Sequence, residues 1–394
     1  MRYIGIDVAS ETHAVAGVAE DGEPLLASFR FTEDAEGYGQ LFEKLGSSQD
    51  TVVAMEATGH YWKNLFAALA ARGFAVALLN PLRTRRFAEE DLERTKTDAI
   101  DALGIARFAA QKRPRVTRLP DTATEELREL VRLRDRIVQE IGDRVRQLHR
   151  LVDLGFPEFT RHVRSLDSYL ATALLHAFPT AKAFERVAPS RVSKIVYDER
   201  HRVGLELARQ LVEAARRSVA AHHGPAYQVQ VRYLCEDLDV LRQRLRDISK
   251  DVEHQLDTHE VGSLLTTIDG IGPLTAARLV AELGDPTSFE SPAALAAYVG
   301  VIPALRQSGK RTSQRAALTT IGHARLRSAL WMPTLSAVRC NPWLRAHYQR
   351  LRANGKPTKV ALVACMRKLL HAVYAVARNR KPFVPNVPVR EAAT

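Results

Sequence analysis

Four acidic residues in the first 101 positions have side chains and spacings that suit metal binding. Asp7 lies in an alternating segment, on the side opposite its apolar residues, and Glu56 closes a second, apolar segment. Asp98 and Asp101 stand three residues apart where a helix begins, so their side chains share a face. Because Asp is disfavoured in strands, Asp7 is the hardest of the four to explain by structure alone.

Four converging carboxylates require a counter-charge. Two unit charges 4 Å apart repel by about 1 kcal/mol in water and about 4 kcal/mol at an effective dielectric constant of 20. Hard divalent cations prefer oxygen ligands, and two such ions about 3.5–4 Å apart assist phosphodiester cleavage. Ordinary explanations stay open: Asp98 opposing the helix dipole, Asp101 as a solvated surface residue, and Glu56 as a common strand end.

A polar basic loop over 303–318 contains a candidate nucleophile, Ser308. A serine hydroxyl is a weak nucleophile unless a base, a metal or neighbouring charge activates it, and clustered cations stabilise a phosphorane-like transition state. The alternative is a flexible basic loop with incidental serines. The cations of this loop that we expect to contact nucleic acid are Arg306, Lys310, Arg311 and Arg315.

A glycine turn before a helix is a second candidate contact with nucleic acid. Gly270 and Gly272 belong to the sequence GIGP, which is similar to a helix-hairpin-helix turn. Backbone N–H groups and a helix N-terminus can bind a phosphate without reading base sequence. Arg325 and Arg327 follow in a basic, helical stretch and add positive charge. A tight turn between two helices is the alternative.

The elements around these residues predict an α/β domain followed by all-α structure. Strand-like segments, a hairpin turn at 19–24 and alternating helices and strands indicate an α/β domain over 1–112. Two long amphipathic helices, 123–152 and 227–257, have apolar residues mostly three and four apart, as in coiled coils. With a helical insert between them, they predict an antiparallel arm over 113–261.

The arm has two possible roles: it contacts another protein chain, or it packs within one subunit. We favour the first. A compact helical domain over 262–378 carries the glycine turn and Ser308, and the Pro-rich tail 379–394 is expected to be mobile.

The composition favours a polyanion partner in a reducing compartment. There are 57 Lys and Arg against 45 Asp and Glu, a formal charge of +12. Three widely spaced cysteines argue against a disulfide framework or a structural zinc site. Asp7 and Glu11 interrupt any apolar leader, and the most apolar late stretch is judged too short and too charged to span a bilayer. We expect a cytoplasmic protein that associates with the nucleoid, not a membrane.

These residues resemble those of a known family. The order Asp7, Glu56, Asp98 and Asp101, in the contexts YIGIDVASETH, AMEATGHYW and KTDAIDA, closely resembles the DEDD transposases of the IS-one-ten insertion-sequence family. LLTTIDGIGPLTAARLVAELGD, AAYVGVIP, RQSG and GHARLRSALWMP look like the C-terminal domain of that family. The resemblance covers nearly the whole chain, least clearly 155–225.

The resemblance implies a RuvC-type, ribonuclease-H-like first domain whose four carboxylates bind Mg²⁺, as two ions, with Mn²⁺ as an alternative. It implies that Ser308 attacks a DNA phosphodiester and forms a transient phosphoserine link. The two sites would come from different protomers of a homodimer or homotetramer that assembles through the arm. A structured bridge RNA would pair with donor and target DNA.

The serine region departs from the family pattern. Family members often have Ser-Gly-Gly-Lys or Ser-Gly-Thr-Ser, whereas this chain has Ser308 followed by Gly-Lys-Arg-Thr-Ser, so Ser313 is an alternative nucleophile. Thr320 stands where Lys is common, which removes one expected phosphate contact. We predict a DNA transposase or recombinase. A junction-resolving endonuclease and a non-catalytic nucleic-acid-binding scaffold are the competing hypotheses.

Overall fold

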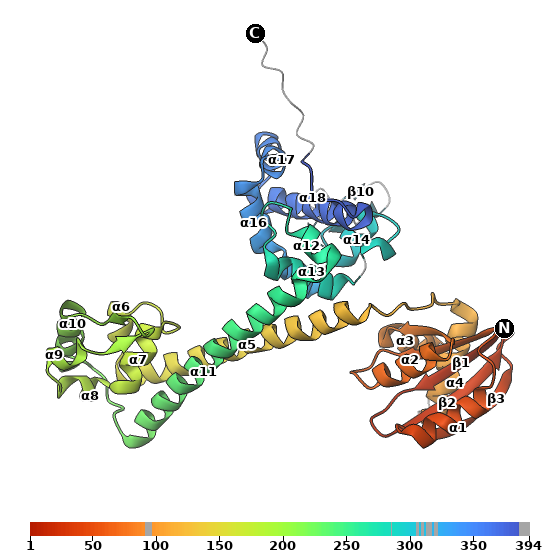
Figure 1. The fold of residues 1–394 in the computed structure, drawn as a ribbon, viewed down its shortest axis with the longest axis horizontal. Helices are drawn as coiled ribbons and strands as arrows, with labels where there is room; N and C mark the ends of the chain where they lie inside the picture. The colour runs from red at the N-terminus through yellow and green to blue at the C-terminus, as the bar shows by residue number, and fades with distance from the viewer. Residues whose placement is uncertain are drawn as a thin grey trace, which may run out of the picture. The chain divides into compact units, whose positions relative to one another are not determined.

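The computed structural model describes residues 1–90, 97–284, 286–304, 307–308, 311–312, 317–318 and 322–385. The chain forms two compact units, Met1–Leu119 and Pro120–Thr394. The first is α/β and the second is mostly helical (Figure 1), which confirms the predicted combination of an α/β domain with helical structure. The finer boundaries at 112, 261 and 378 stay predictions.

A five-stranded mixed sheet forms the centre of the first unit. The strand order is β3-β2-β1-β4-β5, with β1, β4 and β5 parallel and with β2 antiparallel to both of its neighbours. This order brings the two strands that end in Asp7 and Glu56 together. The strands are β1 (Arg2–Asp7), β2 (Thr12–Ala19), β3 (Pro24–Thr32), β4 (Thr51–Glu56) and β5 (Ala75–Leu79).

Helices cover both faces of this sheet. On one face, α1 (Ala35–Leu45) and α2 (Trp62–Ala71) pack on the apolar side of β1 and β4. On the other face, α4 (Asp98–Lys112) packs on the side that carries Asp7. Because each face of the central strands meets a helix, both sets of alternating residues are buried, except at the strand ends.

Two helices of this unit, α1 and α3 (Pro81–Glu90), were not predicted. Signals for both are present. Asp34 caps α1 by accepting a hydrogen bond from the N–H of Gly37 at 2.7 Å, and the Asn80 side chain accepts one from the N–H of Leu82 at 2.9 Å at the start of α3. The apolar periodicity of α3 is too sparse to reveal the helix.

Two long helices dominate the second unit: α5 (Thr122–Gly155) and α11 (Pro225–Asp257). They lie side by side (Figure 1). Side-chain hydrogen bonds join Gln255 to Glu126 near one end of the pair and Arg144 to Asp237 further along, so the helices are antiparallel. This confirms the predicted pair of helices; α5 is four residues longer than expected and α11 is two residues longer. A coiled-coil arm that mediates assembly stays a prediction.

The insert between these helices packs on the distal half of the pair. Phe156, Phe159 and Phe184 are fully buried and form an aromatic cluster, with ring centroids 5.3–6.3 Å apart. The elements of the insert are α6 (Phe159–His162), α7 (Tyr169–Ala177), α8 (Ala181–Glu185), α9 (Pro189–Val192), β6 (Val196–Tyr197), β7 (His201–Arg202) and α10 (Leu205–Arg216).

A separate core forms at the other end of the helix pair, around α18. Leu127 and Val131 of α5 and Val252 and Leu256 of α11 belong to it. The elements of this part are α12 (Glu260–Leu265), α13 (Pro273–Leu283), the 3₁₀ turn η1 (Pro286–Ser288), α14 (Pro292–Val299), α15 (Ala324–Ala329), α16 (Trp331–Cys340), α17 (Pro342–Ala353) and α18 (Thr358–Asn379).

Two expectations for this part need correction, and the start of the predicted mobile tail makes a contact. The predicted loop over 303–318 contains four two-residue strands: β8 (Pro303–Ala304) pairs with β11 (Ala317–Leu318), and β9 (Gln307–Ser308) with β10 (Arg311–Thr312). The basic, helical stretch that begins with Arg325 and Arg327 is divided into two helices, α15 and α16. The start of the tail is docked: the Phe383 ring contacts that of Trp343, with centroids 5.4 Å apart.

The expectation that the apolar late stretch is too short to span a membrane is also wrong as a statement about length. By length and composition, α18 passes that test, and it is the single such helix in the described residues. However, 61% of its apolar window is buried inside the unit. Burial in the core of the second unit therefore explains why α18 is apolar.

Candidate functional site

The sheet places Asp7 and Glu56 next to each other. Ile6 of β1 pairs with Met55 of β4, so the residues that follow, Asp7 and Glu56, end two adjacent parallel strands. Both side chains are partly exposed. The carboxyl ends of adjacent parallel strands meet at one edge of a sheet, which is where α/β domains place functional groups.

The helix α4 brings two further carboxylates to this edge. Gly5 leaves no room for a side chain, because a Cβ there would overlap the carbonyl oxygen of Ala102. Ala14, which pairs with Asp7 across the sheet, packs on Ala102. The first turn of α4, with Asp98 and Asp101, therefore lies towards the Asp7 end of β1.

Helix capping does not explain Asp98. Thr97 is the N-cap residue of α4, and its hydroxyl accepts a hydrogen bond from the N–H of Ile100 at 3.3 Å. The Asp98 carboxylate instead accepts a hydrogen bond from the Arg30 guanidinium at 2.7 Å. Both side chains are more than half exposed, so this ion pair stabilises the fold by about 0–1 kcal/mol at most.

The four side chains do not form a finished ligand shell. Across the residues that the structure describes, no three His, Cys, Asp or Glu side chains lie close enough to hold one metal ion. The Glu56 carboxylate accepts a hydrogen bond from the Thr84 hydroxyl, and Asp98 is paired with Arg30. The backbone positions converge, and the predicted metal site stays a prediction.

Two residues at this edge were missed by the sequence reasoning. Arg30 pairs with Ala14, and Ala14 with Asp7, so Arg30 lies in the same row of the sheet as Asp7. The Thr84 hydroxyl of α3 donates a hydrogen bond to the Glu56 carboxylate. Neither has a local sequence signal, because each reaches the site through strand register or helix packing.

A buried network holds the loop that follows Asp7. His13 is fully buried; one ring nitrogen lies 3.2 Å from the N–H of Ala9, and the other 2.6 Å from Glu33. Burial tends to raise the pKa of Glu33, but hydrogen bonds from Tyr38, His13 and Asn64 outweigh it and lower that pKa overall. A histidine within an apolar strand segment was the available signal, and the sequence reasoning did not use it.

The segment with the proposed nucleophile is described only in part. Ser308 lies in β9, opposite Arg311 of β10. Arg306, Lys310, Ser313, Arg315 and Thr320 fall outside the described residues. The assignment of Ser308 or Ser313 as nucleophile therefore stays a prediction.

A charged cluster anchors the chain where this segment rejoins the helical core. The His323 N–H donates to the Tyr298 carbonyl at 2.9 Å, and its Nε2 lies 3.2 Å from the Glu282 carboxylate. Arg132 and Arg325 lie 3.7 and 3.9 Å from the same carboxylate. The hydrogen bond with His323 lowers the pKa of Glu282, and it exceeds the opposing effect of burial.

The glycine turn has one structural and one open position. A Cβ on Gly270 would lie 2.5 Å from that of Ala337, and its φ is +100°, so glycine is required there for packing. Gly272 is the exposed N-cap residue of α13, and no side chain caps that helix end. A phosphate contact at Gly272 stays a prediction, whereas packing explains Gly270.

The two predicted arginines of α15 differ in their partners. Arg325 is 70% exposed and lies near Glu282. The Arg327 guanidinium donates to the carbonyl of Val299, the last residue of α14, at 3.3 Å. Arg325 is therefore available for a ligand, while Arg327 is partly committed to the fold.

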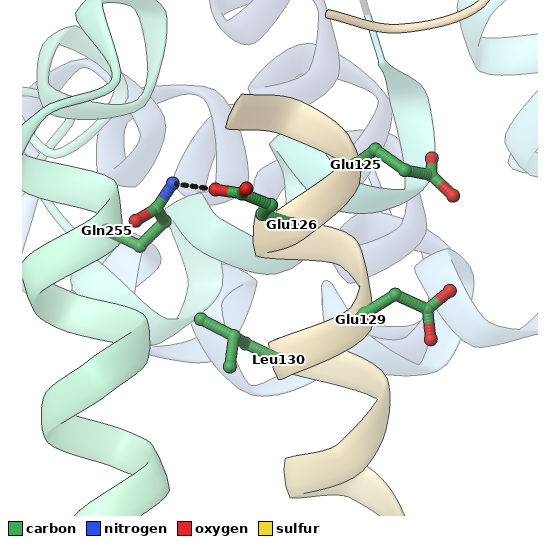
Figure 2. A pocket seen from close by; sticks show the side chains of 5 residues that line it. All are labelled: Glu125, Glu126, Glu129, Leu130 and Gln255. Atoms are coloured by element: carbon green, nitrogen blue, oxygen red, sulfur yellow. Dashed lines mark hydrogen bonds between the residues drawn. The ribbon is translucent and has the colours of Figure 1, made fainter. Parts of the chain in front are cut away.

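An acidic pocket lies at the start of α5 (Figure 2). Its lining is Glu125, Glu126, Glu129, Leu130 and Gln255. Gln255 donates to Glu126 at 3.2 Å, whereas the carboxylates of Glu125 and Glu129 point away from that pair. The three carboxylates thus share no ligand position, and the pocket is not a metal site.

Comparison with known proteins identifies relatives of both units. Residues 4–157 match the DEDD transposase family of the IS110 type, and residues 262–349 match the transposase IS116/IS110/IS902 family. The insertion element IS110 43.6 kDa protein of Streptomyces coelicolor is 25% identical over 98% of this chain and 96% of its own length.

Two further relatives carry more informative names. The pilin gene-inverting protein of Moraxella bovis is 26% identical, with 97% of each chain covered. The putative transposase of the IS117 mini-circle of Streptomyces coelicolor is 28% identical, with 97% of this chain and 95% of the relative covered. Taken with the match of both halves in order, these similarities show that the chain belongs to the IS110 family of insertion-sequence transposases.

Proposed function

We propose that this transposase breaks and rejoins DNA by serine transesterification, with Asp7, Glu56, Asp98 and Asp101 binding divalent cations. The observation that supports the proposal is the row formed by the ends of β1 and β4, towards which α4 directs its first turn. Two magnesium ions are proposed, with manganese as an alternative.

The residues at this edge fit such ions. All four side chains offer hard oxygen ligands, and all are at least partly exposed. The ion pair of Asp98 with Arg30 is weak enough for a cation to replace Arg30. Thr84 would keep the Glu56 carboxylate oriented. A bound divalent cation would polarise the scissile phosphate.

Ser308 supplies the nucleophile in this proposal. Its hydroxyl oxygen forms a bond to phosphorus, one bridging P–O bond breaks, and the serine proton goes, through solvent, to the departing oxygen. The product is a phosphoserine link and a free DNA hydroxyl. Attack of another DNA hydroxyl on that link restores the serine, so no external energy source is consumed.

The proposed partners are donor and target DNA, a structured bridge RNA that pairs with both, and a second or further copies of this chain joined through α5 and α11. The relatives named for pilin gene inversion and for transposition support DNA rearrangement. The reaction would take place on cytoplasmic, nucleoid DNA. The bridge RNA and the assembly rest on the family resemblance alone.

Trapping of a covalent protein–DNA adduct tests the nucleophile. We expect Ser308→Ala to abolish both the adduct and strand transfer while leaving DNA binding intact, with Ser313→Ala as the matched control. Loss in Ser313→Ala alone would move the assignment to Ser313. Metal-dependent cleavage without any adduct would favour an endonuclease, and binding without cleavage would favour a scaffold.

Asp101→Ala tests the carboxylate half of the proposal. We expect excision to be lost while the melting temperature stays unchanged, because the side chain is partly exposed at the first turn of α4. Normal excision by this variant would remove Asp101 from the site.

A further inference from the structure

The excess of positive over negative charge in this protein is confined to its last quarter. Residues 291–390 contain no Asp or Glu and 18 Lys and Arg. The rest of the chain has 39 Lys and Arg against 45 Asp and Glu, a small negative excess. The formal charge of +12 is therefore a property of one region and not of the whole surface.

Eight cations of α16, α17, the turn before α18 and the first half of α18 have no carboxylate partner among the described residues. The Arg345 and Arg352 guanidiniums donate hydrogen bonds to backbone carbonyl groups, and the Arg350 guanidinium lies 3.1 Å from the His347 ring nitrogen Nδ1. No described carboxylate pairs with any cation of the group. Its members are Arg339, Arg345, Arg350, Arg352, Lys356, Lys359, Arg367 and Lys368.

The centre of this group is structurally fixed. The Lys368 ammonium lies 4.1 Å from the centroid of the Trp343 ring, and that ring packs on Phe383. Burial and the neighbouring Arg350 together lower the pKa of Lys368, and burial, Lys368 and Arg350 lower the pKa of His347. The fold thus holds like charges close together across α17 and α18, an arrangement that a bound polyanion would relieve.

The aromatic residues indicate which polyanion fits. Recognition of single strands relies on exposed rings that stack on bases. Trp343 is covered by Lys368 and Phe383, and no aromatic side chain of α17 or α18 is exposed. A surface with charge and without a stacking platform suits the backbone of a duplex.

We propose that the α17–α18 hairpin is a docking surface for the phosphate backbone of duplex DNA, with Arg350 and Lys368 at its centre. The inference rests on the proposed function in that DNA is the substrate. It adds a contact surface that lies outside the glycine turn, the serine segment and the carboxylates. Contacts of this kind hold the duplex in register and do not read its sequence.

The salt dependence of binding tests this surface. In the full-length chain with Ser308→Ala, we would measure the affinity for a non-specific DNA duplex over a range of salt concentrations. Each lost phosphate contact reduces the slope of log K against log salt by about 0.9, so Arg350→Gln with Lys368→Gln should reduce it by about 2. The matched control is Lys194→Gln with Arg202→Gln, two exposed cations of the insert that make no described ion pair.

The control pair removes the same charge from another place. An equal reduction by both pairs, or none by the first, would overturn the proposal. If the first pair unfolds the protein, Lys356→Gln with Lys359→Gln gives the same test, because Lys356 lies just before α18, Lys359 lies in its first turn, and both are exposed. A reduction seen with single-stranded DNA or an RNA hairpin but not with the duplex would overturn the choice of ligand. Because catalysis is not measured, these outcomes are independent of the serine mechanism.

Discussion

The carboxylate edge of the first unit and the cationic region of the second use charge in different ways. At the edge of the sheet, a few acids are placed by strand register and by the contact of Gly5 with α4. Residues 291–390 contain no Asp or Glu, and their Lys and Arg side chains are distributed over several helices. The first region depends on exact atomic positions, whereas the second depends on the sum of many charges. One substitution should therefore disable the first but only weaken the second.

The largest difference is expected between cleavage and binding. Asp7→Asn should reduce DNA cleavage by roughly 10²–10³-fold, the cost of removing one preorganised electrostatic group from an active site. The same variant should bind duplex DNA as the parent does, because the cationic region is intact. Single-turnover cleavage and equilibrium binding of the same protein samples measure the two effects. Equal losses of cleavage and binding would remove the distinction between the regions.

The next effect concerns the contact that positions α4. Gly5→Ala should lower the free energy of unfolding by about 1–3 kcal/mol, because the new Cβ overlaps the backbone of α4. Gly39→Ala is the matched control: Gly39 lies at an exposed position of α1 with open space around it, and the substitution should be neutral or stabilising by up to about 1 kcal/mol. Urea unfolding measures both. A Gly5→Ala protein as stable as the parent would contradict the close contact.

A smaller effect of pH is expected at the anchor of the serine segment. The pKa of Glu282 is lowered below its ordinary value of 4.5, so its stabilising contribution is complete above that pH and is lost as the pH falls through the lower, folded value. Glu282→Gln should therefore destabilise the protein at neutral pH and flatten the fall in stability between about pH 5 and pH 3. Melting temperatures across this range check the prediction, and parallel curves for the two proteins would contradict it.

The smallest effect is expected from Arg30. Arg30→Gln frees the Asp98 carboxylate from an exposed ion pair worth at most about 1 kcal/mol, so affinity for Mn²⁺ should rise by about fivefold or less. Calorimetric titration measures it. A fall in affinity would mean that Arg30 supports the metal site and does not compete with it.

Most of the α/β fold could be predicted because its signals are local. The alternating segment that contains Asp7 and the hairpin turn at 19–24 correspond to elements of the structure. The placement of Asp7 in a strand, of Glu56 at a strand end and of Asp98 and Asp101 at a helix start was predicted in the same way.

What could not be predicted depends on contacts between distant segments. The pairing of Asp98 with Arg30 spans 68 positions and follows from the register of three strands. The docking of Phe383 depends on a ring that lies 40 positions earlier in the chain. The uneven distribution of acids was visible in the sequence, but the overall charge alone does not reveal it.

The most direct test is a Mn²⁺ titration followed by electron paramagnetic resonance. A Mn²⁺ ion that binds the protein no longer contributes to the spectrum of the free ion, so the loss of that spectrum measures binding. Binding by the parent protein should be lost in Asp7→Asn and in Asp101→Asn, and it should persist in Asp50→Asn, an exposed acid in the turn before β4. Equal binding by all four proteins would contradict a metal site at the ends of β1 and β4.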